Sequence, residues 1–201
     1  GVGGCPHSAS LGHTIGRSDK TRFFTGNKRV MGYELTRRHF VDLLRAYHPS
    51  SYEAFGADDA RFSIPMYHAM KCRDRLHVAL KSGLRRLPFE KQTIVDLGPF
   101  PGSLLRLLRR LDYTHSAQLC GAGLMDSDKL VEFMQRVVQA DIHAVNLDPA
   151  GGQFQSKGYP EKVPLPDNSV QLVFALEIIE HLTSPFHLLS EAYRVLGSGG
   201  H

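Results

Sequence analysis

The sequence lacks the features that would assign it to a membrane or to an oxidising compartment. No stretch approaches the roughly 18 consecutive apolar residues that a membrane-spanning helix needs, so we expect no membrane span. The three cysteines are odd in number and far apart, which indicates neither a disulfide framework nor a zinc knuckle. The first residues also lack the charged-then-apolar layout of a secretion signal. Together these absences predict a reducing, cytoplasmic setting.

Several ligand-binding motifs are absent as well. The glycine loop GPFPG, residues 98–102, does not supply the dinucleotide fingerprint G-x-G-x-x-G, and no G-x-x-x-x-G-K-[ST] phosphate loop exists. These absences disfavour NAD and ATP as ligands. The zinc motif H-E-x-x-H is missing too, so Glu180 and His181 do not form a metal site and no metal is expected.

The chain does contain a marked charge asymmetry. Residues 1–91 hold 16 Lys and Arg against 8 Asp and Glu, whereas residues 92–201 hold 8 against 12. A basic front segment can attract an anionic substrate or nucleic acid. Solvated helix faces are the simpler explanation, because no RNA-binding signature accompanies the charge.

Three regions follow one another along the chain. Residues 1–32 are rich in Gly and Ser without a hydrophobic period, which predicts a flexible lead-in. Residues 33–91 contain two amphipathic helix patterns and predict a helical cap segment without a catalytic signature. From residue 92 to 201, short apolar runs alternate with helical patterns, which is typical of βαβ units. We therefore predict an α/β fold, a Rossmann-like parallel sheet with flanking helices, preceded by the N-terminal helical segment. The predicted strands are TIVDLG, SAQLCGAGLM, IHAVNLD and VQLVFALEII.

Acidic residues lie within, or at the end of, three of these predicted strands. Asp96 lies in the first, Asp126 ends the second and Asp148 ends the third. Ligands of such sheets bind beyond the carboxyl ends of the strands. A single Asp there is usually a helix cap or a loop residue, but three acids in register with a glycine loop predict a cofactor site. The amides that open the helix SLLRLLRRL can receive a carboxylate or phosphate, because they lack partners within the helix.

Two stretches carry a family resemblance. VDLGPFPG, residues 95–102, resembles the first motif of the class I S-adenosylmethionine-dependent methyltransferases, usually an acid followed by three alternate glycines. Residues 163–200, VPLPDNSVQLVFALEIIEHLTSPFHLLSEAYRVLGSGG, are similar almost end to end to the fourth strand and next helix of the methyltransferase type 11-like group. The resemblance covers residues 93–200. It implies S-adenosylmethionine as cofactor and methyl transfer to a small-molecule or glycan acceptor.

The resemblance also implies roles for single residues. The acid and glycines of the first motif would line the methionine end of the cofactor, Asp126 would take the ribose hydroxyls, and Asp148 would lie near the adenine. Residues 177–181 would border the place where the methyl leaves. His181 is the candidate catalytic base there, although a histidine packed and hydrogen-bonded under the loop is the simpler interpretation. The cofactor-binding residues implied are Asp96, Gly98, Gly102, Asp126, Asp148 and Glu177.

Two features depart from the family pattern. Phe100 stands where a glycine would let the backbone approach the ligand, and the flanking prolines stiffen the loop, so Gly98 and Gly102 must supply the close approaches. No fifth strand follows Gly200, which would leave VQLVFALEII as a bare apolar edge. Either the sequence is a fragment, or an oligomer contact or partner chain covers that edge. The alternative function is therefore an inactive methyltransferase-like binding module or fragment that acts through a partner protein.

A nucleic-acid acceptor is disfavoured. After the fourth predicted strand the chain reads ALEIIEH, residues 175–181, where amino-nitrogen methyltransferases of nucleic acids carry an Asn-Pro-Pro-Tyr or Asp-Pro-Pro-Tyr loop. A cysteine nucleophile for base methylation is missing there too.

Overall fold

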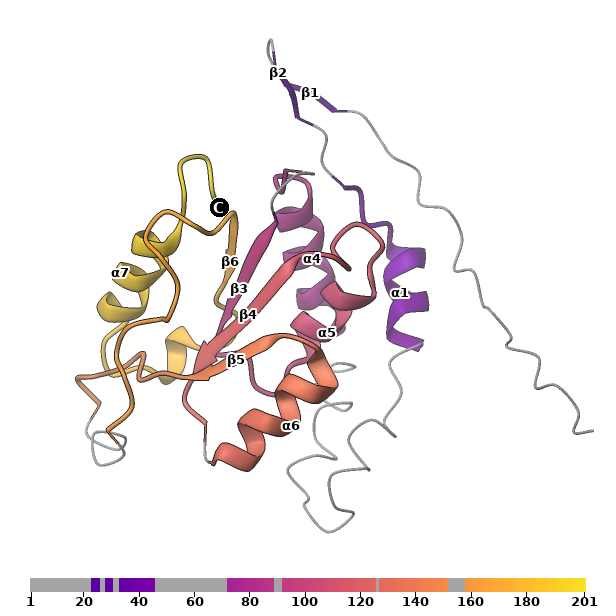
Figure 1. Cartoon of the computed structure of the whole chain (residues 1–201). Coiled ribbons are helices and arrows are strands. Elements are labelled where there is room, and N and C mark those ends of the chain that lie inside the picture. The colour runs from indigo at the N-terminus through magenta and orange to yellow at the C-terminus, as the bar shows by residue number, and fades with distance from the viewer. Residues whose placement is uncertain are drawn as a thin grey trace, which may run out of the picture.

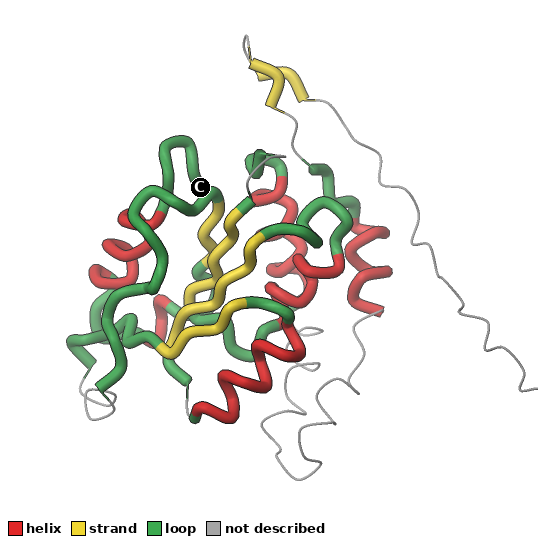
Figure 2. Tube along the Cα trace, viewed as in Figure 1, coloured by secondary structure: helices red, strands yellow, loops and turns green. Residues whose placement is uncertain are grey.

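The computed structural model describes residues 23–25, 28–30, 33–45, 72–88, 92–125, 127–151 and 158–201. The candidate ribose ligand Asp126 and the predicted helical turns at 65–71 lie outside these described residues. Figures 1 and 2 show a central sheet with helices packed on both of its faces. No helix within the described ranges is long and apolar enough to cross a membrane.

The sheet has four parallel strands in the order β5-β4-β3-β6. It confirms the predicted α/β fold, because each predicted strand contributes and a helix follows β3, β4 and β6. From β3 the chain adds β4 and then β5 on one side, and it then returns to add β6 on the other side of β3. Ligands of open α/β sheets bind at such a switch point. The elements are β3 (Thr93–Leu97), α5 (Ser103–Arg110), β4 (Gln118–Gly123), α6 (Asp128–Val138), β5 (Asp141–Ala144), β6 (Leu172–Phe174) and α7 (Phe186–Val195).

Side chains alternate between two hydrophobic cores on the two faces of the sheet. In β3, Ile94 enters one core, and Val95 and Leu97 enter the other. Helices α5 and α6 cover the Ile94 face, together with α1 (Arg37–Arg45) and α4 (Arg73–Leu84), and α7 covers the opposite face (Figure 1). Both faces of the sheet are thus buried, as the nearly continuous apolar runs of the strands require.

The helices predicted as a cap share the main core of the sheet. Leu80 and Leu84 of α4 are completely buried in the same cluster as Ile94. The missing side chain at Gly83 lets α4 pack closely on β6, because a Cβ atom built there would lie 2.9 Å from Cζ of Phe174 in β6. Helix α4 is therefore a layer of the sheet domain, and it reaches the switch point.

Two short strands precede these helices. β1 (Phe23–Thr25) and β2 (Lys28–Val30) pair antiparallel, with Phe23 opposite Val30. They lie within the segment that the sequence predicted as a lead-in without regular structure. Three-residue strands are too short to produce the alternating pattern from which strands are predicted.

The outer edge of β6 differs from the sequence expectation. The stretch VQLVFALEII predicted a long strand with a bare edge, but β6 spans only Leu172–Phe174. Residues 197–201 turn back along it: the Val173 N–H donates to the His201 carbonyl at 2.8 Å, and the His201 N–H donates to the Gln171 carbonyl at 3.1 Å. Gly199, with φ +78°, lies in the turn that brings them there. The edge is thus paired by the chain itself at these positions.

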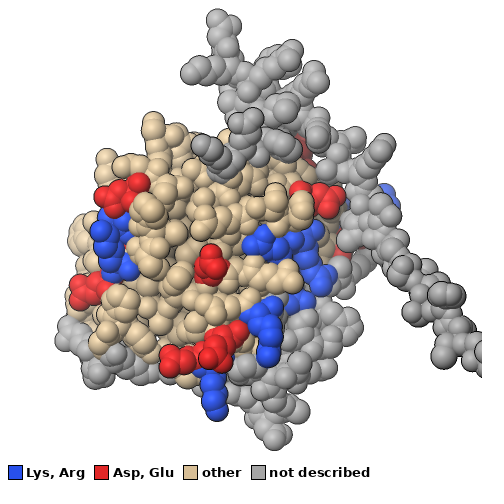
Figure 3. All heavy atoms as spheres, viewed as in Figure 1, with Lys and Arg blue, Asp and Glu red and all other residues tan. Residues whose placement is uncertain are grey.

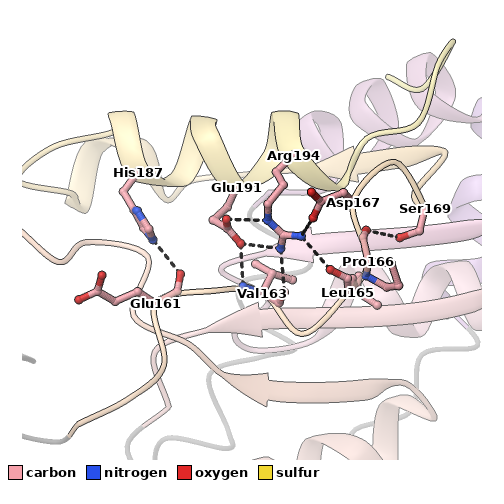
Figure 4. A network of polar contacts seen from close by, with 9 residues as sticks. All are labelled: Glu161, Val163, Leu165, Pro166, Asp167, Ser169, His187, Glu191 and Arg194. Carbon is pink, nitrogen blue, oxygen red and sulfur yellow. Dashed lines mark hydrogen bonds and ion pairs between the residues drawn. The ribbon is translucent and has the colours of Figure 1, made fainter.

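A buried polar network holds the turn before β6 against α7 (Figure 4). Glu191 accepts the Val163 N–H at 2.8 Å and two bonds from the Arg194 guanidinium, each 2.8 Å. Arg194 also donates to the carbonyls of Val163 and Leu165 and to Asp167. The VPLPDNS turn is therefore fixed by side chains of the helix that follows the strand.

Candidate functional site

A cavity of about 710 Å³ opens at the carboxyl ends of β3 and β6, at the switch point of the sheet. Small-molecule sites have volumes of this order and are lined mostly by apolar groups with a few polar ones. Four segments that are distant in the sequence form most of its wall: α4, the loop after β3 with the start of α5, residues 147–148 after β5, and residues 175–182 after β6.

Asp96 lines this cavity. The residue is only 4% exposed, and its carboxyl group has no hydrogen-bond or ion-pair partner among the described residues. Burial raises its pKa to about 8, so the group carries a proton at neutral pH. A buried polar group without a partner is unfavourable, and a cationic ligand group entering the cavity would supply one.

The start of α5 borders the same cavity as Asp96. Ser103 lines the cavity, and its buried hydroxyl oxygen has no hydrogen-bond partner among the described residues. The first N–H groups of a helix lack acceptors within the helix, and the helix dipole favours an anion there. One cavity therefore offers both a carboxylic acid and a set of hydrogen-bond donors. Sequence reasoning identified the helix amides but not the Ser103 hydroxyl.

The two glycines of the GPFPG loop serve different contacts. Both adopt the left-handed conformation, with φ +78° at Gly98 and +90° at Gly102. Gly98 lines the cavity, and a Cβ atom there would lie 2.6 Å from Cδ1 of Ile178. Gly102 is outside the cavity lining, and its Cβ would instead meet Val138 of α6 at 2.7 Å. The predicted close approach at Gly102 is thus an approach between α5 and α6.

Asp148 lines the cavity, but its carboxylate is already bound by the protein. It accepts the Thr183 N–H at 2.7 Å and the Ser184 N–H at 3.1 Å. Burial by itself would raise its pKa, but these hydrogen bonds stabilise the charged form and lower the pKa overall. Asp148 therefore stays ionised and ties the segment after β5 to the wall formed after β6.

Glu177 connects the wall after β6 to helix α4. Its φ of +54° is unusual for a residue with a side chain. The carboxylate forms an ion pair with Arg75 and accepts the Cys72 thiol at 3.5 Å, and all three residues line the cavity. Sequence reasoning missed Cys72 and Arg75, because no local pattern links α4 to a residue about a hundred positions later.

His181 lies in the 3-10 helix η2 (Ile179–His181) and lines the cavity. Its side chain is exposed, and its ring makes no hydrogen bond to a described residue. The interpretation of a histidine packed and bonded under the loop does not fit this position. The structure thus brings five of the predicted residues to one cavity: Asp96, Gly98, Asp148, Glu177 and His181.

Charges on the surface are mixed. On the face shown in Figure 3, Lys and Arg side chains alternate with Asp and Glu over the described residues, without a continuous basic surface.

Comparison with known proteins finds similar sequences for the C-terminal part of the chain. Residues 119–201 match the Methyltransf_11 family, described as a methyltransferase domain. The chain is also 31% identical over 85 residues to a Mycolicibacterium smegmatis protein named "Probable S-adenosylmethionine-dependent methyltransferase". That match covers 40% of this chain and 33% of the relative, so the chain spans about a third of that protein's length.

Several solved structures are similar to parts of the chain. One is an S-adenosylmethionine-dependent methyltransferase from Aquifex aeolicus, with 17% identity over 75% of this chain and 68% of that one, at a TM-score of 0.39. Another is the complex between the Haloferax volcanii Trm112 methyltransferase activator and a methyltransferase, with 27% identity over 74% of this chain and 57% of that one, at 0.42. At these TM-scores the superpositions are too loose to transfer residue roles.

The parallel sheet with its ligand cavity at the switch point defines a Rossmann-like domain. The sequence matches add a likeness: residues 119–201 are similar to the methyltransferase domain family, and the matched relative is named as an S-adenosylmethionine-dependent methyltransferase.

Proposed function

We propose that this cavity binds S-adenosylmethionine and directs its methyl group to a small-molecule or glycan acceptor. The observation that carries the proposal is that one cavity is lined by the buried acid Asp96, which makes no hydrogen bond or ion pair to a described residue, and by the unpartnered Ser103 hydroxyl at the start of α5. An amino acid group has an ammonium and a carboxylate on one carbon, and these two features of the cavity complement them.

The proposed orientation of the cofactor follows from this pair. Asp96 receives the ammonium of the methionine part, and the Ser103 hydroxyl and first α5 amides receive its carboxylate. Asp126, which follows β4 in the sequence, is proposed to take the ribose hydroxyls, and the adenine is proposed to lie beside Asp148. Gly98 allows the backbone to approach the ligand without a side chain in between.

The proposed mechanism depends on alignment. When bound, S-adenosylmethionine supplies a methyl group on a positively charged sulfur. The cavity walls hold the acceptor in line with that methyl and exclude competing water. His181, exposed at the cavity, takes the proton from an acceptor that must lose one.

Calorimetric titration with S-adenosylmethionine and S-adenosylhomocysteine tests the proposal. We expect micromolar binding, weakened at least tenfold in Asp96→Asn and in Ser103→Ala, because each change removes a buried charge-assisted bond worth about 1.5–3 kcal/mol. Asp128→Asn is the matched control, since Asp128 is an exposed acid on α6 outside the cavity lining. A folded chain that binds neither ligand contradicts the proposal and favours the alternative of a binding module that acts through a partner.

A further inference from the structure

We propose that Phe100 and Glu180, two residues of the cavity lining, select an acceptor that carries an amine beside an apolar group. This inference rests on the proposed function and deepens it. Asp96, Ser103 and Asp148 are the lining residues proposed above for the cofactor, and Phe100 and Glu180 are not among them.

Phe100 is the one phenylalanine in the cavity lining. It lines the cavity and is 46% exposed, which is high for a large apolar side chain at a concave site. It occupies the position where the family pattern has a glycine, so its ring is an addition to the loop. The face of an aromatic ring attracts an alkylammonium group and also packs against apolar groups.

Other apolar side chains line the same cavity. They come from α4, from the start of α5 and from the segment after β6, namely Leu76, Leu104, Ile178 and Leu182. These groups suit the carbon skeleton of a small molecule, and they leave its polar group to be recognised by the few charges nearby.

The charges of the described lining residues include one carboxylate without a cationic partner. Arg75 and Glu177 form an ion pair with each other. Glu180 lines the same cavity, is exposed, and has no ion pair or hydrogen bond among the described residues. Its carboxylate attracts a cationic acceptor and repels a carboxylate or phosphate.

The chemistry of an amine acceptor balances with the residues present. The amine arrives as an ammonium beside Glu180 and gives one proton to the His181 imidazole. Its nitrogen lone pair then forms the bond to the methyl carbon, while the carbon–sulfur bond breaks and leaves its electron pair on sulfur. The products are an N-methylammonium and the neutral thioether S-adenosylhomocysteine.

Three probes of one shape and different charge test the proposal: phenethylamine, 2-phenylethanol and 3-phenylpropionate. Each is titrated into the full chain saturated with S-adenosylhomocysteine, and binding is followed by ligand-observed NMR. We expect the amine to bind about tenfold more tightly than the carboxylate, with the alcohol between them.

Variants assign the effect to residues. Phe100→Leu keeps apolar bulk and should weaken amine binding about threefold, and Phe100→Ala should weaken it about tenfold. Glu180→Gln should lower the amine-to-carboxylate ratio about three- to tenfold. Ile179→Ala is the matched control, because Ile179 is also 46% exposed and neighbours the wall but is not part of the cavity lining.

The outcomes separate the two proposals. A chain that binds S-adenosylhomocysteine but prefers the carboxylate, or shows no preference, overturns the acceptor assignment alone. Equal effects of Phe100→Ala and Ile179→Ala overturn the role of Phe100, as does a loss of S-adenosylhomocysteine binding in Phe100→Ala. A folded chain that binds neither S-adenosylhomocysteine nor phenethylamine overturns both proposals.

Discussion

Single residues at this site have environments that the sequence predicted only in part. Asp96, Asp148 and Glu177 were expected near one another, because the carboxyl ends of parallel strands meet at one edge of a sheet. Their bonding partners differ completely: Asp96 has none among the described residues, Asp148 is held by two backbone amides, and Glu177 is paired with Arg75. Partners depend on loops that fold over the site, and local sequence patterns do not encode those contacts.

Replacing Asp96 should make stability less dependent on pH. Burial raises its pKa from 3.8 to about 8, so between these values the native state holds a proton that the unfolded chain has lost. This contribution is fully present below pH 4 and is lost as pH rises to 8. Thermal and urea unfolding should therefore show that Asp96→Asn gains up to about 4 kcal/mol relative to wild type between pH 5 and pH 8. A constant difference between the two proteins would contradict the burial of this acid.

The same proton should appear in ligand binding. An ammonium beside Asp96 favours the ionised carboxyl, so cofactor binding should release the proton below pH 8. The affinity for S-adenosylhomocysteine is then expected to rise with pH between 6 and 8, by up to about tenfold per unit, and to level off above 8. Calorimetry in buffers of different ionisation enthalpy measures the proton count directly. Asp96→Asn should abolish the slope, and a slope that persists in this variant would assign the proton to another group.

At the scale of elements, the alternation of strands and helices was predictable, and the ends of β6 were not. Largely apolar runs six to ten residues long identified every strand of the main sheet, since strands buried on both faces are nearly all apolar. VQLVFALEII continued that pattern beyond Phe174, but the chain leaves the sheet there, and Glu177 with its positive φ follows. The departure opens the cavity, and nothing in the apolar pattern marks it.

The junction between α5 and α6 depends on Gly102. A side chain there would meet Val138 at 2.7 Å and would also have to adopt φ +90°. Gly102→Ala should lower the free energy of unfolding by about 2–4 kcal/mol, because strain and overpacking add. Gly158→Ala is the control: it has φ +61° with no atom within 4 Å of the added Cβ, and should cost only about 1 kcal/mol. Equal losses in urea unfolding would show that packing at Gly102 is unimportant.

The contact of α7 with the turn before β6 depends on Glu191. Its hydrogen bond to Arg194 is the largest of the influences that lower its pKa, so the pair stabilises the fold above the ordinary pKa of a glutamate and loses that effect in acid. Glu191→Gln should destabilise the protein by about 2–3 kcal/mol at pH 7, because it leaves the mostly buried Arg194 guanidinium without the Glu191 carboxylate. Glu161→Gln serves as control, since only the Glu161 backbone carbonyl takes part in the network. The difference between the variants should vanish near pH 3 in thermal unfolding.

At the scale of the whole molecule, α1 and α4 share one hydrophobic core with the sheet. The amphipathic pattern of residues 33–91 predicted helices there, and α1 and α4 lie within that range. In the structure α4 lies on β6, and α4 with the preceding Cys72 supplies Cys72, Arg75 and Leu76 to the cavity. Only packing over a long sequence separation brings these residues to the site, so they were its least predictable part.

Truncation of the chain tests whether the sheet needs α1 and α4 in order to fold. A chain of residues 92–201 loses Leu80 and Leu84, which are completely buried against the sheet, and should fail to unfold cooperatively in urea. A chain of residues 33–201 keeps α1 and α4 and should retain a single transition. A sharp transition in the shorter chain would mean that α4 is dispensable for the fold.

Several cavity-lining residues are also core residues, and this limits how the protein can change. Leu76 and Leu104 belong to the cluster under α4 and α5, and Leu147 belongs to the cluster under α7. A substitution that enlarges the cavity at these positions also removes packing from the fold. Variation toward bulkier acceptors is therefore easiest at Phe100 and Glu180, whose side chains are exposed, and selection for new substrates should act first on those two positions.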